Sequence, residues 1–277
     1  MSDSTIVIDL NFKNSQGHFL REIQHQLDIV TLLLAGAQNV TKAQAKPTGM
    51  HNFSPAHGAE LPHEEARNKA LEWLNSSFLR DTIEATDQFL GRCLSFCAAI
   101  ELAGKGGVKM AVLDHLINVL PLKHHKLHFP AKIATLESKY GVQPNFTEHV
   151  LSLNKIRTCL VHRMGRVGKS DSDENGRLVA KWVTSQMVLR GLETGTQLIL
   201  TEPGQGLNEE SMLEMHIVEH EKVFQLGEKV SLSPYDTYST IFTLWKFGLA
   251  CSEAVEQLAI KSGVPINKQN ENVQVVE

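Results

Sequence analysis

The sequence has few cysteines, four among 277 residues. All of them, Cys93, Cys97, Cys159 and Cys251, lie in apolar stretches with helical periodicity. A disulfide framework is excluded, because such frameworks belong to short, cysteine-dense secreted chains. We therefore expect buried free thiols in a reducing compartment. For Cys93 and Cys97, four residues apart, packing is favoured over a metal or redox role.

Long apolar runs are also missing. The longest, Ile29 to Ala37, is far shorter than the roughly 20 residues that cross a bilayer. The first residues lack the basic region and apolar core of a signal peptide, so we expect a cytoplasmic protein without membrane contact. The composition, 42% hydrophobic and 21% charged, is typical of a globular chain with a core of its own.

Positive charge is scarce overall but concentrated in one window. The net charge is −4, which argues against a protein that coats nucleic acid. From Pro121 to Lys169, however, nine Lys and Arg accompany only two acids, giving 9 − 2 = +7 and leaving −11 for the remainder. Five of the thirteen histidines also fall there. The window suits an anionic ligand, although a solvated surface balanced by neighbouring acids would look the same.

Hydrophobic periodicity predicts a mainly helical fold. A 3.6-residue repeat of apolar side chains marks most of the chain outside 171–232. The expected helices are 16–40, 64–103 with a possible break at Asn75-Ser-Ser77, 108–120, 130–140, a helix capped by Thr147 that runs to about Met164, and 234–262. Residues 41–63 are expected to form a flexible loop and 263–277 a frayed tail.

The segment 171–232 has a different pattern, with β-branched and aromatic residues between turn-rich stretches. It predicts strands at 177–192 and 196–201 and two further strands at 213–218 and 222–231. The expected architecture is a helical bundle with a small antiparallel sheet inserted before the last long helix, in a single domain over 1–277.

The run Asn154-Lys-Ile-Arg-Thr-Cys-Leu-Val-His-Arg-Met-Gly165 carries the strongest functional signal. Arg157 offers a permanent cation that can contact two phosphate oxygens, and His162 can exchange a proton near neutral pH. Together they could cleave RNA without a metal, through a deprotonated 2′-hydroxyl and a protonated leaving oxygen. Two side chains five residues apart on a helix point about 140° away from each other around the axis, so one straight helix would not aim both groups at one phosphate. Two copies around a two-fold axis could share a cleft.

The run also resembles the R-x4-6-H motif of the HEPN superfamily. The resemblance implies a helical bundle that forms a homodimer, with Arg157 binding the scissile phosphate and His162 acting as acid and base. It further implies an RNA hydrolase, a toxin or antiviral defence protein, with an antitoxin or defence partner. Where the family often has Asn, Asp or His after the arginine, this chain has Thr158. Inactive members bind a partner protein or a nucleotide-like ligand, which is the alternative reading.

The surrounding basic residues complete the predicted site. RNA contacts are expected from Thr158, Arg163, Arg166 and Lys155, and from Lys123 and Lys126 in the histidine-rich stretch. A surface ion pair for Arg157 and a helix-end role for His162 remain open, as does a helical structural or regulatory protein unrelated to the superfamily.

No metal or cofactor is expected. Gly104-Lys-Gly-Gly107 lacks the spacing of a phosphate-binding loop. His124 and His128 have zinc-compatible spacing without an evident third ligand. His216 and His220 would lie roughly 13 Å apart on a strand, too far to bind one ion.

Overall fold

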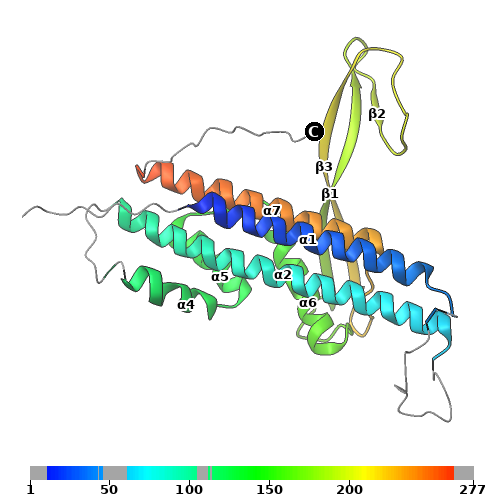
Figure 1. The fold of residues 1–277 in the computed structure, drawn as a ribbon, viewed down its shortest axis with the longest axis horizontal. Helices are drawn as coiled ribbons and strands as arrows, with labels where there is room; N and C mark the ends of the chain where they lie inside the picture. The colour runs from blue at the N-terminus through cyan, green and yellow to red at the C-terminus, as the bar shows by residue number, and fades with distance from the viewer. Residues whose placement is uncertain (1–10, 43, 46–60, 105–111, 113, 265–277) are drawn as a thin grey trace, which may run out of the picture. The chain divides into compact units, whose positions relative to one another are not determined.

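The computed structural model describes residues 11–264 except 43, 46–60, 105–111 and 113. It is mainly helical, with a three-stranded antiparallel sheet before the last helix, which confirms the predicted fold class (Figure 1). The elements are α1 (Phe12–Asn39), α2 (His63–Ala103), the π-helix η1 (His115–Val119), α4 (Leu120–His125), α5 (Phe129–Tyr140), α6 (Thr147–Arg163), β1 (Arg177–Gly191), β2 (Gln197–Ile199), β3 (Ser211–Gln225) and α7 (Pro234–Lys261).

The chain forms two compact units, and the three long helices contribute to both. The first unit contains α1 up to Leu20, α2 from Thr86, then η1, α4 and α5, and α7 from Phe247. The second contains the other parts of these helices together with α6 and the sheet. A single domain over 1–277 stays a prediction. Most of the predicted 41–63 loop and 263–277 tail lies outside the described residues.

Aromatic packing forms the core of the first unit. The rings of Phe19 and Phe89 stack with centroids 4.4 Å apart, and both side chains are buried. A Cβ atom at position 248 would lie 2.0 Å from Phe19, so only glycine allows α7 to pass this ring. Cys93, Cys97 and Cys251 are also buried and free in this unit, as predicted. Burial is the main reason that the pKa of each thiol is raised.

A buried ion pair joins α2 to α5 in the first unit. The ammonium group of Lys132 is fully buried, and its Nζ donates to the Asp87 carboxylate at 2.5 Å and to the Asp87 carbonyl at 3.0 Å. Removing either partner would leave the other as an uncompensated buried charge, so loss of one side chain would destabilise the protein strongly. The ends of α5 agree with the prediction, with Pro130 in the first turn and Gly141 in the left-handed region at φ 66°.

Two helical predictions were wrong in detail. α2 runs unbroken through Asn75, because that side chain bonds to a neighbouring segment instead of competing with its own backbone. The predicted 108–120 helix lies partly outside the described residues, but its described part continues to His125. Pro121 does not stop it, because α4 starts there and the first turn does not need that N–H.

The sheet is a long two-stranded ribbon with a short third strand. β1 pairs antiparallel with β3 over its whole length, from Arg177 opposite Gln225 to Gly191 opposite Ser211 (Figure 1). We call the end of the ribbon at Gly191 and Ser211 its distal end, and β2 pairs with β1 there. The strands predicted at 213–218 and 222–231 are one strand that ends at Gln225. Glu219 and Glu221 do not interrupt it, because their side chains face solvent while His220, between them, stacks on Trp182.

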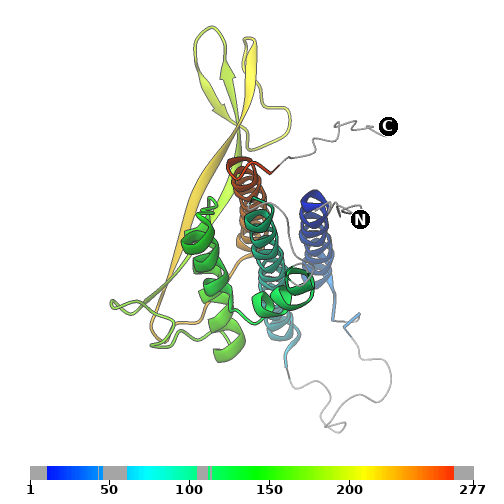
Figure 2. The same ribbon diagram turned by 90° about the vertical axis from the view of Figure 1, so that its left-hand side faces the viewer.

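Hydroxyl groups on two helices cover the outer edge of β1. Ser152 of α6 accepts from the N–H of Lys181, and Thr243 of α7 accepts from the N–H of Val183. The same hydroxyls lie within 3.4 Å of the carbonyls of Lys181 and Val183. Figure 2 shows α6 beside this part of the ribbon. Further along, the β1 edge is occupied by β2. An uncovered edge would template pairing with other chains.

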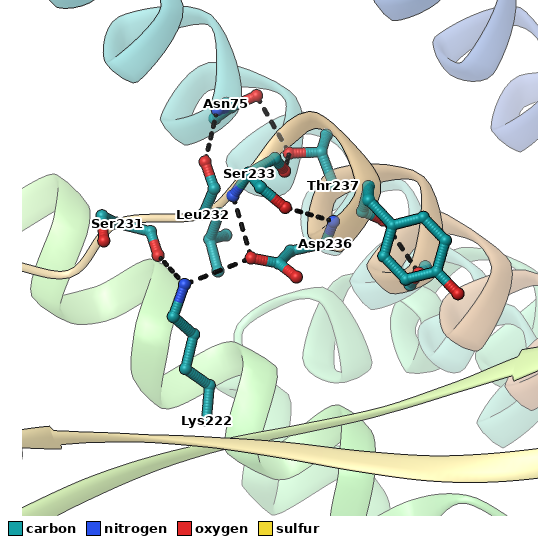
Figure 3. Close-up of polar contacts among 9 residues, drawn as sticks. Asn75, Lys222, Ser231, Leu232, Ser233, Asp236 and Thr237 are labelled. Atoms are coloured by element: carbon teal, nitrogen blue, oxygen red, sulfur yellow. Dashed lines mark hydrogen bonds and ion pairs between the residues drawn. The ribbon is translucent and has the colours of Figure 1, made fainter.

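The start of α7 is fixed by a polar junction of three segments in the second unit (Figure 3). Ser233 and Asp236 form a reciprocal capping box, in which each side chain accepts from the other's backbone N–H. Asn75 of α2 donates to the Leu232 carbonyl at 2.8 Å and accepts from the Thr237 hydroxyl at 2.9 Å. Lys222 of β3 reaches the Ser231 carbonyl and Asp236. The junction therefore sets where β3 gives way to the last helix.

None of the helices in the described ranges combines the length and the apolar character that a membrane crossing requires.

Candidate functional site

The predicted motif lies in the C-terminal half of α6. One face of this helix is buried in the second unit through Val150, Leu153, Ile156 and Cys159. Its first residue, Thr147, donates its hydroxyl to the Pro144 carbonyl, so it does not cap the helix as an acceptor as predicted. The last turn ends at Met164 and Gly165, both in the left-handed region with φ 51° and 78°. α6 is therefore anchored along its length and presents its opposite side to solvent.

Arg157 lies close to the buried side of α6. Its side chain is half-buried, and Nη2 donates to the Asn154 side chain at 2.7 Å. Nε is buried and has no partner among the described residues. The guanidinium is therefore partly desolvated and has hydrogen-bonding capacity left, which favours an anion or an acceptor that approaches it.

His162 lies on the exposed side. It forms no hydrogen bond or ion pair with any described residue, and the 140° separation from Arg157 expected for five helical residues holds along the unbroken α6. Lys155, seven residues earlier, is only about 20° away from His162 around the helix and is also exposed. Within one chain, α6 thus brings together His162 and Lys155 but not His162 and Arg157.

The other predicted RNA contacts mostly stabilise local structure. Thr158 donates to the Asn154 carbonyl at 2.9 Å within the helix. Arg163 pairs with the buried carboxylate of Asp171, which also accepts from the Gly168 N–H and so fixes the loop after α6. Arg166 is exposed and donates to the Gly227 carbonyl at 2.9 Å. These three side chains need no ligand to account for their positions.

Lys123 and Lys126 are exposed on and just after α4. They belong to the first unit, whereas α6 from Glu148 onward belongs to the second.

The histidine-rich stretch around them has structural roles. His124 is buried, with Nδ1 3.1 Å from the Ser95 hydroxyl, and burial lowers its pKa, helped by the charges of Lys139 and Lys132. His128 is the N-cap of α5 and accepts from the Ala131 N–H. Within the described part of the chain, no group of three or more His, Cys, Asp or Glu side chains is arranged to hold a metal ion.

A cavity of about 370 Å³ lies beside the end of α6 in the second unit. Leu160 and Met164 line it from α6, Trp73 lines it from α2, and the segment from Lys229 to Leu232 closes it. Lys229 is paired with Glu72 of α2 at this cavity. Its walls are mostly apolar and uncharged apart from this pair and Lys69, so it is not a phosphate site of the predicted kind.

Sequence reasoning missed the partners that occupy the basic side chains. Asp171 lies at the start of the turn-rich 171–232 segment, and no sequence signal indicated that its carboxylate accepts the Gly168 N–H and pairs with Arg163. Cys159 lies near the same loop, and burial, with Asp171 nearby, raises its thiol pKa to about 11. A nucleophilic role for Cys159 is therefore disfavoured.

No family model, curated protein or solved structure matches the chain.

Proposed function

We propose that the protein is a metal-independent endoribonuclease of HEPN type that works as a homodimer. The observation that carries the proposal is the exposed imidazole of His162, which has no partner among the described residues, beside the exposed ammonium of Lys155 on the solvent side of α6. Cations and a titratable imidazole on an anchored helix suit a negatively charged backbone. A toxin or defence role, with a cognate partner protein, follows from the resemblance of the motif.

The chemistry needs one proton removed and one proton supplied. The 2′-hydroxyl of RNA loses its proton to a base and attacks phosphorus, and the bond from phosphorus to the 5′-oxygen breaks as that oxygen gains a proton. An imidazole can serve in either step. Arg157 would stabilise the negative charge of the phosphorane through the N–H groups that Asn154 does not occupy.

Two copies are required by the geometry of α6. Because Arg157 and His162 point about 140° apart, the arginine that meets a phosphate held by His162 would come from the second copy. A two-fold axis would then create two equivalent clefts from one pair of helices.

The test is RNA cleavage in EDTA by the wild type, His162→Ala and His25→Ala, all shown to be folded. His25 is the matched control because it is also an exposed helical histidine. We expect cleavage by the wild type and His25→Ala and a loss of about 100-fold or more in His162→Ala. No cleavage by any of the three proteins, or equal cleavage by all of them, would refute the assignment.

A second candidate is a catalytically silent module that binds a partner or a nucleotide-like ligand. It is favoured by the half-buried position of Arg157 and its bond to Asn154, which suit a structural role. The two functions differ in what Arg157→Lys does. A nuclease would lose activity with little change in stability, whereas a binding module would show no cleavage in either form.

A further inference from the structure

From Ser211 to Val223, the outer edge of β3 is a row of backbone N–H and C=O groups that have no partner among the described residues. The order of the sheet is β2-β1-β3, so β3 pairs on one side only. On β1, the groups of Lys181, Val183 and Met187 point away from β3, toward Ser152, Thr243 and Leu200. In an antiparallel pair, two residues that face each other either both bond across the pair or both point away from it. Odd-numbered residues of β1 face odd-numbered residues of β3, so these β3 residues direct their N–H and C=O groups to the free edge.

The distal half of this edge also carries exposed apolar side chains. Leu213 and Met215 are each 54% exposed, and Ile217 is 37% exposed. All three are odd-numbered, so their side chains share one face of the ribbon while their own N–H and C=O groups lie at the free edge. A long, apolar edge strand is the kind of surface that pairs with another strand.

We propose that β3 pairs antiparallel with β3 of a second copy of this chain, with the two-fold axis at Met215. In this register each Met215 faces its counterpart, and Leu213 faces Ile217 of the second copy. The odd residues then exchange backbone hydrogen bonds directly, as the alternation of the edge requires. On the other face, Glu214 lies opposite His216 of the second copy, so opposite charges meet when the imidazole is protonated.

Neighbouring registers are less favourable. An axis at residue 214 would set two Glu214 carboxylates against each other. An axis at residue 216 or 217 would place Leu213 opposite the carboxylate of Glu219 or Glu221. Like charges directly opposite each other on two strands are destabilising, and so is an apolar side chain that covers a carboxylate. Of these registers, the one centred on Met215 avoids both kinds of unfavourable contact.

The pairing has a defined length. With the axis at Met215, Glu219 lies opposite Ser211, the first residue of β3. Beyond it, Glu221 has no strand residue to face, and its charge discourages further pairing. The interface thus covers the apolar distal half of the strand and stops at its first edge carboxylate.

This association is separate from the proposed nuclease site. α6 contacts β1 at Lys181, whose partner on β3 is Glu221, six residues and about 20 Å along the strand from Met215. Pairing at Met215 would leave the two α6 helices on opposite sides of the axis. The edge pairing and RNA cleavage can therefore succeed or fail independently.

The first experiment measures the mass of the full chain in solution by light scattering. We expect the wild type at twice its monomer mass of 30.8 kDa or above, because pairing through α6 would add further copies to the edge dimer. In Met215→Lys two like charges would meet at the axis, so we expect the dimer dissociation constant to rise by about ten-fold or more. Met187→Lys is the matched control, because Met187 lies opposite Met215 on β1, away from the free edge, and should keep the mass of the wild type. A monomeric wild type, a Met215→Lys variant whose mass equals that of the wild type over a dilution series, or equal losses in both variants would overturn the proposal.

The second experiment reads the register directly by disulfide formation. The four native cysteines are buried, so an introduced edge cysteine is the reactive thiol. Opposed residues have Cα atoms about 5.5 Å apart, within disulfide range, whereas Leu213 and its own counterpart would be about 14 Å apart. Met215→Cys should therefore cross-link two chains, and Leu213→Cys alone should not. Cross-linking by Leu213→Cys alone, or none by Met215→Cys, would contradict an axis at Met215.

Discussion

Asn75 is the side chain whose loss should tell most about the second unit. It is 6% exposed, and its amide joins α2 to the segment that starts α7 (Figure 3). Its Nδ2 donates to the Leu232 carbonyl and its Oδ1 accepts from Thr237. We predict that Asn75→Ala destabilises the protein by about 2–4 kcal/mol without changing the fold.

The magnitude follows from what each partner keeps. Two hydrogen bonds of roughly 1 kcal/mol each are lost. Thr237 retains its bond to the Ser233 carbonyl, so its hydroxyl stays satisfied. No other partner replaces Asn75 at the Leu232 carbonyl among the described residues, so burial of this acceptor adds about 1 kcal/mol or more.

The assay is urea unfolding followed by circular dichroism, with the wild type and Ser76→Ala beside Asn75→Ala. Ser76 is the neighbour on α2, and among the described residues its hydroxyl bonds only to the Glu72 carbonyl one turn earlier. Its loss should therefore stay within about 0.5 kcal/mol. The midpoint of Asn75→Ala should fall at an unchanged slope. A midpoint equal to that of Ser76→Ala would refute the reasoning that this junction holds α7 in place.

Three further predictions concern the first unit and Cys159. Lys132→Ala leaves Asp87 without its partner and should lower the free energy of unfolding by about 3 kcal/mol, seen in a chemical melt. Burial lowers the pKa of His124, so below about pH 6.5 the unfolded chain binds a proton that the folded chain refuses. Stability should fall as the pH drops through this range, and His124→Gln should flatten that dependence in unfolding curves at several pH values. Finally, with thiol pKa values of about 12 and 11, Cys97 and Cys159 should react with a thiol reagent at pH 8 only after unfolding, and fast labelling of native protein would contradict their burial.

The helices could be predicted from the sequence because their signals are local. Apolar periodicity located α1, α2, α6 and α7, and turn chemistry fixed both ends of α5 at Pro130 and Gly141. The start and type of β1 were also predictable from its alternating pattern and the turn before it. These features depend on residues within one or two turns of each other.

The errors at Asn75 and at Glu219 and Glu221 involve partners that are distant in the sequence. Asn75 looks like a helix breaker until Leu232, 157 residues later, supplies its acceptor. In the sequence, Glu219 and Glu221 resemble a turn. In the structure, His220 between these two glutamates stacks on Trp182 and forms a hydrogen bond with Thr184, both on β1, and the strand continues. No local pattern contains this information, so propensity was overridden by tertiary contacts.

The candidate site was predictable in part. The sequence placed Arg157 and His162 on one helix and indicated that they would diverge around it, and the helix is present. It did not indicate that Arg157 is half-buried against Asn154, or that Arg163 is occupied by Asp171. A count of basic residues cannot distinguish a free cation from one whose partner lies in the next loop. The RNA-binding surface therefore stays a prediction that rests chiefly on Lys155 and His162.

The hydroxyl cover on the β1 edge has a consequence for how the chain is made. Thr243 meets Val183 sixty residues after that strand has been synthesised, and until then this part of the edge is uncovered. A nascent chain that pauses before α7 would expose the edge of β1 while β3 already offers its own. Such intermediates are where strands of neighbouring chains pair wrongly, so slow translation through α7 should increase aggregation. We therefore expect Thr243 to contribute to the folding yield as well as to the finished fold.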